Sequence, residues 1–462
     1  MRFGLFILAN ALLFIRPSEL IAELSAVELY RWVILACLAV SLPMVMQQIT
    51  VRYPGVPPIV TCVVLLLPAV FLSGLFHGNT ELIQETVTEY AKILIYFLLL
   101  ISLVADVANL QRFLRWIALF SAAVTLVAVL RYHADVAQPA APKVKADSME
   151  PKSTKAARHG TFVVDKVRDP KTGEMIDVQR MCGTGIFNDP NDFALILVTA
   201  IPLCLYRLTD PEARATRPLW LLLLLFFGYA LMLTHSRGGF LALMGGLGVL
   251  VHLKYGAKRT VMLAAICLPV LLALFAGRMT DISADEGTGQ TRIQLWSDAL
   301  MFFQQSPLLG IGMDNYGQFS SHVAHNSFLH SFTELGLIGG TLFLGAFFFS
   351  LKGMFDLRRI YRPGVEATGQ PEDVDPDLRR LYPVVMGTLV AYSIGIFFLS
   401  RCYIVPTYLA LGVVVVYLRL HARQASVPMP AWNFLAWPRL AGVSCLFLMA
   451  SFTFVRLFVN WK

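Results

Sequence analysis

The residues of this chain that are best suited to chemistry are His325 and Asn326, which stand at the start of a long apolar segment. A histidine with an ordinary pKa of about 6.5 can accept or release a proton near neutral pH, so it can serve as a general base. Ionisable groups at a membrane boundary are costly, and they therefore often mark a site or a pathway. A lone histidine in such a place is more often an interfacial residue than a catalyst, so its surroundings have to decide between the two.

The apolar segment that follows carries a second polar pair, His330 and Glu334. These residues lie at positions i and i+4 and therefore share one face of a helix. Buried together, they would satisfy each other, so we interpret this pair as structural. Asn326 is expected to cap the same helix, because its side-chain oxygen can accept hydrogen bonds from the first backbone N–H groups.

Two arginines stand just before other apolar segments. Arg180 precedes a glycine-rich bend and then Asp189, which is followed by a proline and Asn191, a pattern typical of a helix start. Arg237 lies in a tight turn between two apolar segments, where Ser236 can cap the second. Helix amino termini and arginine side chains together suit an anion such as phosphate. The alternative is that each arginine anchors its segment at lipid headgroups.

A third arginine, Arg292, opens a stretch with apolar residues at helical spacing over residues 290–303. We expect an amphipathic helix on the membrane interface there, followed by a turn-rich loop that reaches Tyr316. The alternative is a surface-seeking helix followed by an ordinary loop. If the apolar segments enter the membrane from one side, Arg180 and Arg237 would place two positive charges beside His325, which would be the base. That combination suits chemistry on a lipid-linked phosphate.

The composition is that of a polytopic membrane protein. Hydrophobic residues make up 56% of the 462 positions, charged residues make up 15%, and the mean hydropathy is +0.64. Apolar runs of spanning length recur along the whole chain. We predict an all-α protein with about twelve transmembrane helices, or thirteen if the last run also spans, at Phe3–Ile15, Leu29–Met46, Pro57–Phe76, Thr86–Val104, Phe113–Arg131, Phe193–Leu205, Pro218–Leu233, Phe240–Leu253, Val261–Phe275, Asn326–Leu351, Tyr382–Leu399, Tyr403–Leu420 and Leu440–Val459.

The basic residues of the short loops set the orientation. They collect in alternate loops, among them residues 207–217, 254–259 and 352–362, which are therefore cytoplasmic together with the amino terminus. Two long segments then face the outside. The net charge of +8 reflects this topology and lipid contact, and not nucleic-acid binding. The predicted parts are transmembrane helices over 1–131, a long outer segment over 132–191, helices over 192–276, an outer catalytic loop over 277–325 and helices over 326–462.

At these residues the chain resembles the O-antigen ligase family, which also contains O-antigen polymerases and bacterial protein O-oligosaccharyltransferases. The family pattern of His, a polar residue, nine residues, Gly, two residues and Gly is met by His325, Asn326, Gly336 and Gly339. Three further pieces are similar and stand in the family's order: Arg180, Gly183, Gly185, Phe187, Pro190 and Asn191; then Ser236, Arg237 and Gly238; then Arg292, Trp296, Pro307, Leu308, Gly310, Gly312 and Tyr316. The resemblance covers roughly residues 180–351. Residues 132–179 are longer and more polar than the family pattern, so the acceptor stays open.

The resemblance implies a membrane glycosyltransferase of the all-helical GT-C type, in the bacterial inner membrane, with both outer segments and the active site in the periplasm. Its glycan donor would be carried on undecaprenyl pyrophosphate, its acceptor would be lipid A–core, and membrane lipids would surround it. Arg180, Arg237 and Arg292 would hold the pyrophosphate and stabilise its charge as it leaves. His325 would take the proton of the acceptor hydroxyl in an inverting displacement that needs no metal or other cofactor. A supporting role falls to Asn326, Asp189, Asn191 and Tyr316.

Other activities stay open at this point. An O-antigen or exopolysaccharide polymerase and a protein O-oligosaccharyltransferase would use the same glycan donor and differ only in the nucleophile, so the motifs do not separate them from a ligase. A different class is a transporter or flippase of lipid-linked glycans, in which the arginines bind a lipid phosphate and the histidine relays protons. Against this class, the polar residues cluster at one face and do not run through the spans near the membrane midplane.

Overall fold

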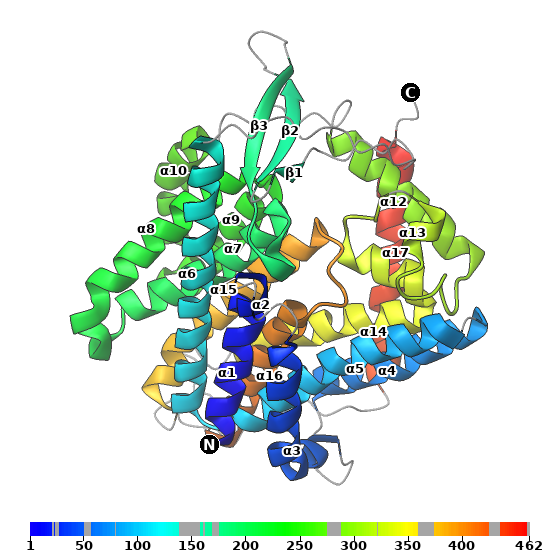
Figure 1. Ribbon diagram of the computed structural model, residues 1–462, viewed down its shortest axis with the longest axis horizontal. Helices are drawn as coiled ribbons and strands as arrows, with labels where there is room; N and C mark the ends of the chain where they lie inside the picture. The colour runs from blue at the N-terminus through cyan, green and yellow to red at the C-terminus, as the bar shows by residue number, and fades with distance from the viewer. Residues whose placement is uncertain are drawn as a thin grey trace. The chain divides into compact units, whose positions relative to one another are not determined.

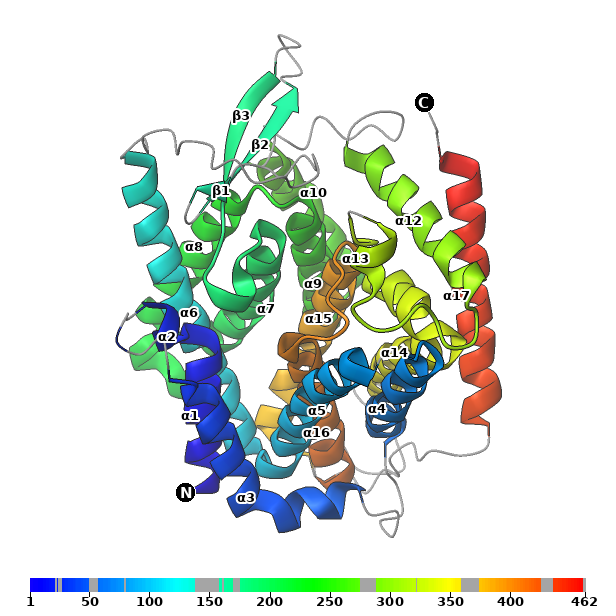
Figure 2. The same cartoon turned by 45° about the vertical axis from the view of Figure 1, so that its right-hand side comes forward.

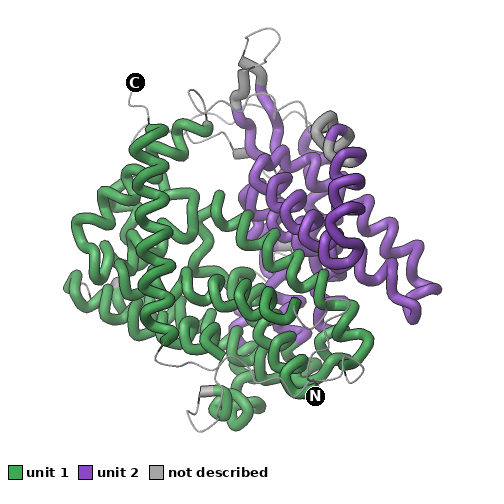
Figure 3. Tube along the Cα trace, turned by 180° about the vertical axis from the view of Figure 1, so that it is seen from behind, with its two compact units in different colours: residues 1–6, 34–112, 283–462 green, residues 7–33, 113–282 purple. Residues whose placement is uncertain are grey.

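The computed structural model of this chain forms two compact units, which Figure 3 distinguishes by colour. The first unit comprises residues 1–6, 34–112 and 283–462, and the second comprises residues 7–33 and 113–282. The structure describes residues 1–20, 23, 27–49, 57–78, 80–137, 158–159, 162–168, 175–274, 288–320, 322–358, 374–424 and 435–459. Much of the two segments predicted to face the outside, including residues 138–157 and 275–287, lies outside the described residues.

The first unit is a bundle of long helices in which α14 (Ser327–Leu357) packs along α4 (Pro58–Phe76) and also contacts α12, α15, α16 and α17 (Figure 1). Small residues permit this close approach. A Cβ on Gly345 of α14 would lie 2.7 Å from Leu440 of α17 and 3.1 Å from Cys62 of α4. The other helices of this unit are most of α3 (Leu29–Ile49), then α5 (Thr80–Leu103), α12 (Thr288–Gln305), α13 (Tyr316–Phe319), α15 (Pro376–Phe397), α16 (Val405–Gln424) and α17 (Ala436–Phe458).

The second unit combines helices with a small antiparallel sheet (Figure 2). Its strands pair in the order β1, β2, β3, and Phe162 of β2 lies opposite Met181 of β3. Helix α7 packs against α8 and α9, and α8 also contacts β3. The elements of this unit are most of α1 (Arg2–Ile15), α2 (Pro17–Leu20), most of α6 (Val107–Ala137), β1 (Arg158–His159), β2 (Phe162–Arg168), β3 (Met175–Met181), η2 (Gly185–Phe187), α7 (Pro190–Leu208), η3 (Pro211–Thr216), α8 (Arg217–Thr234), α9 (Arg237–Tyr255) and α10 (Ala257–Leu274).

The predicted class of polytopic helical membrane protein is confirmed. Each apolar segment predicted to span contains a helix, and 11 helices in the described part of the chain are long and apolar enough to cross a membrane. Helix α17, the thirteenth predicted segment, is one of them. Helices α1 and α10 are not. With 14 residues, α1 is about 21 Å long, short of a hydrocarbon core of about 30 Å.

The sheet is a departure from the sequence prediction, which contains only helices. Its two longer strands do carry a weak sequence signal, because apolar and polar residues alternate over residues 176–179 and a stretch with proline and glycine separates the two runs. Helix α6 also runs to Ala137, past the predicted boundary at residue 131. The predicted outer segment over residues 132–191 therefore begins as helix and includes a β-hairpin before α7.

Candidate functional site

The start of α14 holds His325 in an unusual backbone conformation. Its φ is 49°, in the left-handed region that residues other than glycine seldom adopt. Asn326 is the N-cap, as predicted: its side-chain oxygen accepts hydrogen bonds from the backbone N–H of Phe328 at 3.0 Å and of Leu329 at 3.2 Å. Asn326 is fully buried, whereas His325 is half-buried. The chain therefore turns sharply at the histidine and fixes its cap inside the protein.

Ser327 anchors this turn to the loop between α15 and α16. Its hydroxyl donates to the carbonyl of Leu399 at 2.6 Å and accepts from the backbone N–H of Arg401 at 2.8 Å. The guanidinium of Arg292, in α12, lies over the ring of Phe398 at 5.8 Å from its centroid. Because Phe398 adjoins Leu399, Arg292 and the start of α14 are tied to the same loop.

The second polar pair, His330 and Glu334, is buried, with side chains 9% and 1% exposed. His330 Nε2 lies 3.2 Å from Glu334 Oε2, so the two side chains meet as predicted. They do not fully satisfy each other, because in the part of the chain that the structure describes Glu334 Oε2 and His330 Nδ1 are buried without a hydrogen-bond partner. The ring of Tyr316 stacks on His330 at 5.1 Å between centroids. Burial, followed by the charges of Asp298 and Glu334, raises the pKa of Tyr316, so its phenol stays protonated. Within the described residues, this hydroxyl has no hydrogen-bond partner.

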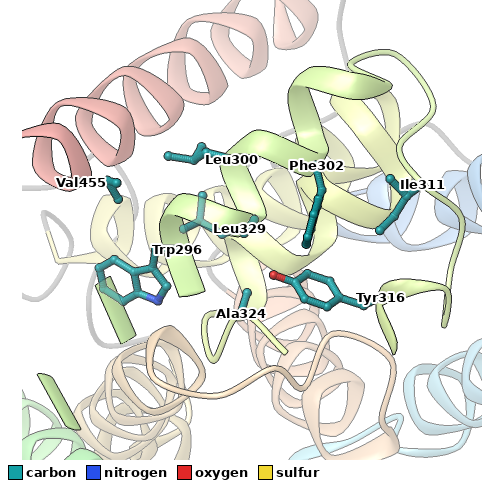
Figure 4. Close-up of a cluster of buried hydrophobic side chains, with 9 residues drawn as sticks. Trp296, Leu300, Phe302, Ile311, Tyr316, Ala324, Leu329 and Val455 are labelled. Atoms are coloured by element: carbon teal, nitrogen blue, oxygen red, sulfur yellow. The ribbon is translucent and has the colours of Figure 1, made fainter. Parts of the chain in front are cut away.

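A hydrophobic cluster positions Tyr316 beneath α12, as Figure 4 shows. The ring of Phe302 meets the ring of Tyr316 edge to face at 5.7 Å. The helix predicted over residues 290–303 is therefore present as α12. Its apolar side is buried against α14 and α17. The amphipathic pattern of the sequence instead predicts that this side faces the membrane interface. The cluster consists of Trp296, Ala299, Leu300, Phe302, Ile311, Tyr316, Ala324, Leu329 and Val455.

Helix α14 is broken at Gly336, and the loop between α12 and α13 fills the break. In a regular helix the N–H of Leu337 would bond to the carbonyl of Thr333. Here Leu337 donates to the carbonyl of Pro307 at 2.7 Å, and the carbonyl of Thr333 accepts from Ile311 at 3.0 Å. The loop therefore enters the hydrogen-bond ladder of the helix and satisfies the backbone groups that the break exposes.

Two glycines and a serine make this approach possible. Gly336 has φ 64° and ψ −161°, a conformation essentially reserved for glycine. A Cβ on Gly310 would lie 2.3 Å from the backbone of Glu334. The hydroxyl of Ser73, in α4, reaches both partners: it lies 2.5 Å from the carbonyl oxygen of Leu309 and 3.1 Å from that of Glu334. The glycines of the sequence motif thus serve the joint between loop and helix.

In the second unit, Arg180 lies on β3 and is held by three other elements. Its Nε donates to the carbonyl of Thr234 at the end of α8 at 3.0 Å, its Nη1 to Asp165 of β2 at 3.0 Å, and its Nη2 to the side-chain oxygen of Asn191 at 2.8 Å. The side chain is 10% exposed. A guanidinium carries five N–H groups, so two remain beyond these three bonds. Arg180, which is predicted to bind phosphate, is therefore held in place by the protein and still has two N–H groups available to donate.

Asn191 links the starts of α7 and α9. Its side-chain oxygen also accepts from the hydroxyl of Ser236 at 2.8 Å, and Ser236 caps α9 by accepting from the N–H of Gly239 at 3.1 Å. Asp189 caps α7, accepting from the N–H of Asn191 at 2.8 Å, so both predicted caps are present. Arg237 is the first residue of α9. Two helix amino termini and two arginines thus lie together, an arrangement suited to an anion.

The predicted site residues fall into two groups, one in each unit. The second unit holds Arg180, Asp189, Asn191 and Arg237, and the first unit holds Arg292, Tyr316, His325 and Asn326. Sequence reasoning misses two residues, Asp165 and Ser73. The hairpin signal could have placed Asp165 near Arg180, but Ser73 has no local signal because its partner Leu309 is 236 residues away. Among the described residues, no group of three or more His, Cys, Asp or Glu side chains could hold a metal ion.

Comparison with known proteins adds one result. Residues 221–344 match the O-antigen ligase family. This stretch contains Arg237, Arg292 and His325, together with the glycines at the break in α14, whereas Arg180 and Asn191 precede it. No curated protein matches the chain. The match supports the family predicted from the sequence motifs.

Proposed function

We propose that this chain, a polytopic membrane protein of the O-antigen ligase family, is a glycosyltransferase that moves a glycan from undecaprenyl pyrophosphate to a lipid A–core acceptor. The reaction takes place at the periplasmic face of the bacterial inner membrane. His325 is the general base, and Arg180, Arg237 and Arg292 bind the pyrophosphate. The arginines supply the positive charge that a metal ion provides in other enzymes of phosphate chemistry.

The backbone of His325 is the observation that carries this proposal. A residue other than glycine in the left-handed region costs about 1–3 kcal/mol and persists only where its surroundings hold it. Here the Asn326 cap and the Ser327 anchor do so. Strain of this kind collects at active sites and ligand clamps. Four described residues other than glycine have a positive φ, namely Arg16, His235, Asp314 and His325, and His325 is the one of them that is the histidine of the family pattern.

The reaction is an in-line displacement at the anomeric carbon. The acceptor hydroxyl gives its proton to His325 as its oxygen forms a new bond to that carbon. The bond from the same carbon to the pyrophosphate oxygen breaks, and undecaprenyl pyrophosphate leaves with the electron pair. Attack from the side opposite the leaving group inverts the configuration.

Negative charge grows on the pyrophosphate as the bond breaks, and fixed positive groups stabilise that charge. Arg237 at the first position of α9 and the amino termini of α7 and α9 are such groups. The ties of Arg180 to Thr234 and Asn191 hold its remaining N–H groups in one orientation, so little reorganisation is needed during the reaction.

Purified full-length protein in detergent, with lipid-linked glycan and lipid A–core, tests the role of His325. We expect His325→Ala to lower kcat by about 10²–10⁴-fold, because the general base is lost. The KM for the glycan donor should change little, since the arginines remain. His322→Ala is the matched control, because His322 is an exposed histidine of the same loop and should leave the rate unchanged. Wild-type transfer by His325→Ala would refute the base assignment.

A deletion strain separates the possible acceptors. Loss of lipid A–core attachment, with long undecaprenyl-linked polymer retained, is the result expected for a ligase. Single repeat units would assign the chain as a polymerase, and normal polysaccharide with under-glycosylated proteins would assign it as a protein O-oligosaccharyltransferase. Glycan transfer by the purified protein itself excludes a flippase.

A further inference from the structure

We propose that Asp165 competes with the pyrophosphate of the glycan donor for Arg180 and is displaced when the pyrophosphate binds. The inference rests on the proposed function, which supplies the diphosphate as ligand. It gives Asp165, which lies outside the stretch that matches the family, a role in setting affinity for that ligand.

The three ties of Arg180 differ in charge. The carbonyl of Thr234 and the amide oxygen of Asn191 are neutral, and both belong to the framework of helix ends in the second unit. Asp165 is the charged partner, 3.0 Å from Nη1. Its side chain is 23% exposed, more than twice the 10% of Arg180. An anion that reaches this guanidinium therefore competes with the carboxylate of Asp165, because both are negatively charged.

The pairing of β2 with β3 does not depend on the side chain of Asp165. Asp165 lies opposite Val178, and Arg180 lies opposite Val163, so the two charged residues are diagonal neighbours on one face of the sheet. Their contact runs through side chains alone, and a rotation of the Asp165 side chain would break it while the strands stay paired. The bonds from Nε and Nη2 would still aim the guanidinium, leaving both N–H groups of Nη1 for a phosphate oxygen.

Charge decides which partner is preferred. A carboxylate carries one negative charge, and the pyrophosphate of a lipid-linked glycan carries two, spread over several acceptor oxygens. The diphosphate can also bind Arg237 and the amino terminus of α9. Arg180 lies near that terminus, because Asn191 accepts hydrogen bonds from both Arg180 and Ser236. A ligand with only one charge would gain less and would displace Asp165 poorly. Asp165 thus lowers the affinity of Arg180 for anions in general, and it lowers the affinity for singly charged anions more than for a doubly charged group.

Inorganic pyrophosphate is a suitable probe, titrated against the full-length protein in detergent at fixed salt with thermal unfolding as the readout. We expect Asp165→Asn to lower the Kd for pyrophosphate by about 3- to 10-fold, because the competing charge is gone and the side-chain shape is kept. Asp165→Ser should act in the same direction. The control is Asp177→Asn on the same hairpin: Asp177 is exposed, lies opposite Lys166 and is three positions from Arg180, on the other face of β3.

The direction of the change separates competition from a purely structural ion pair. Tighter binding in both Asp165 variants, with Asp177→Asn at the wild-type Kd, supports displacement. Unchanged or weaker binding in the Asp165 variants overturns it, because a structural tie would loosen Arg180 when removed. The glycan-transfer assay reports separately: a wild type that binds pyrophosphate but transfers no glycan refutes the proposed function and leaves the competition standing.

Discussion

At the residue scale, two histidines share a left-handed backbone conformation directly before a helix N-cap. His235 has φ 47° and His325 has φ 49°, and each directly precedes the N-cap of a long helix, Ser236 and Asn326 respectively. A left-handed residue turns the chain so that the next side chain can reach the first N–H groups of the helix. His235 is exposed and His325 is half-buried. The same local turn therefore presents two histidines to different surroundings, and only the second meets the family pattern.

Asn326 offers a test in which stability and activity separate. Asn326→Ala should lower the free energy of unfolding by about 1 kcal/mol, because two N–H groups lose their acceptor. Asn326→Ser keeps a cap acceptor and should recover most of that loss. The Nδ2 of Asn326 is buried without a hydrogen-bond partner within the described residues.

If that amide supports catalysis, the Ser variant will unfold like wild type in a thermal melt but transfer glycan more slowly. Wild-type kcat in the Ser variant would limit Asn326 to capping. An Ala variant as stable as wild type would contradict the role of the cap.

At the scale of elements, the broken helix α14 is the feature that joins chain segments far apart in sequence. The loop before α13 supplies hydrogen bonds to α14 on both sides of Gly336, and α4 adds the hydroxyl of Ser73. The polar pair of α14 and the stacked ring of Tyr316 lie beside this joint. Loop and helix therefore pack as one element, next to the ring of Tyr316.

Gly336→Ala tests the joint. The new Cβ would lie 2.3 Å from the backbone carbon of Leu308, and the residue would keep a φ of 64°. We expect destabilisation by about 3 kcal/mol or more, with loss of glycan transfer, because neither backbone can give way. Gly248→Ala in α9 is the control, since a Cβ there meets nothing within 4 Å and alanine favours a helix. Thermal melts of the two variants at equal stability would contradict the described packing.

Local signals predict the parts of this structure that depend on neighbours in the chain. The caps at Asp189, Ser236 and Asn326 follow from residue type and position, and so does the contact between His330 and Glu334. The break in α14 is different. Its glycines are visible in the sequence, but their partners in the loop and in α4 become known only from the fold. The same holds for the ties of Arg180, whose acceptors lie on three separate elements.

At the scale of the whole molecule, two basic residues that bear on the predicted orientation contact the end of a neighbouring helix. Arg419 and Arg423 of α16 donate to the carbonyls of Ile101 and Ala105 at 3.4 and 3.3 Å, at the carboxyl end of α5. Positive side chains there complement the partial negative charge of a helix carboxyl end. Two residues that the positive-inside rule assigns to the cytoplasm therefore also contact backbone carbonyls at and just beyond the carboxyl end of α5.

The predicted orientation can be measured with single cysteines in a background without the native ones. Gln318 of α13 and Lys258 at the start of α10 are both exposed. We expect a membrane-impermeant maleimide to label Gln318→Cys in intact spheroplasts, and to label Lys258→Cys only after permeabilisation. The reverse pattern would invert the topology and remove the periplasmic site. Labelling of both after permeabilisation serves as the control for reactivity.

The joint at Gly336 also bears on how the protein is made. Unpaired peptide groups are expensive in hydrocarbon. The partners that pair the break come from a loop synthesised just before α14 and from α4, whose Ser73 precedes Leu309 by 236 residues. A nascent α14 released alone into the bilayer would lack these partners. We therefore expect insertion of α14 to be cooperative, with α4 already in the membrane when the loop and the helix arrive.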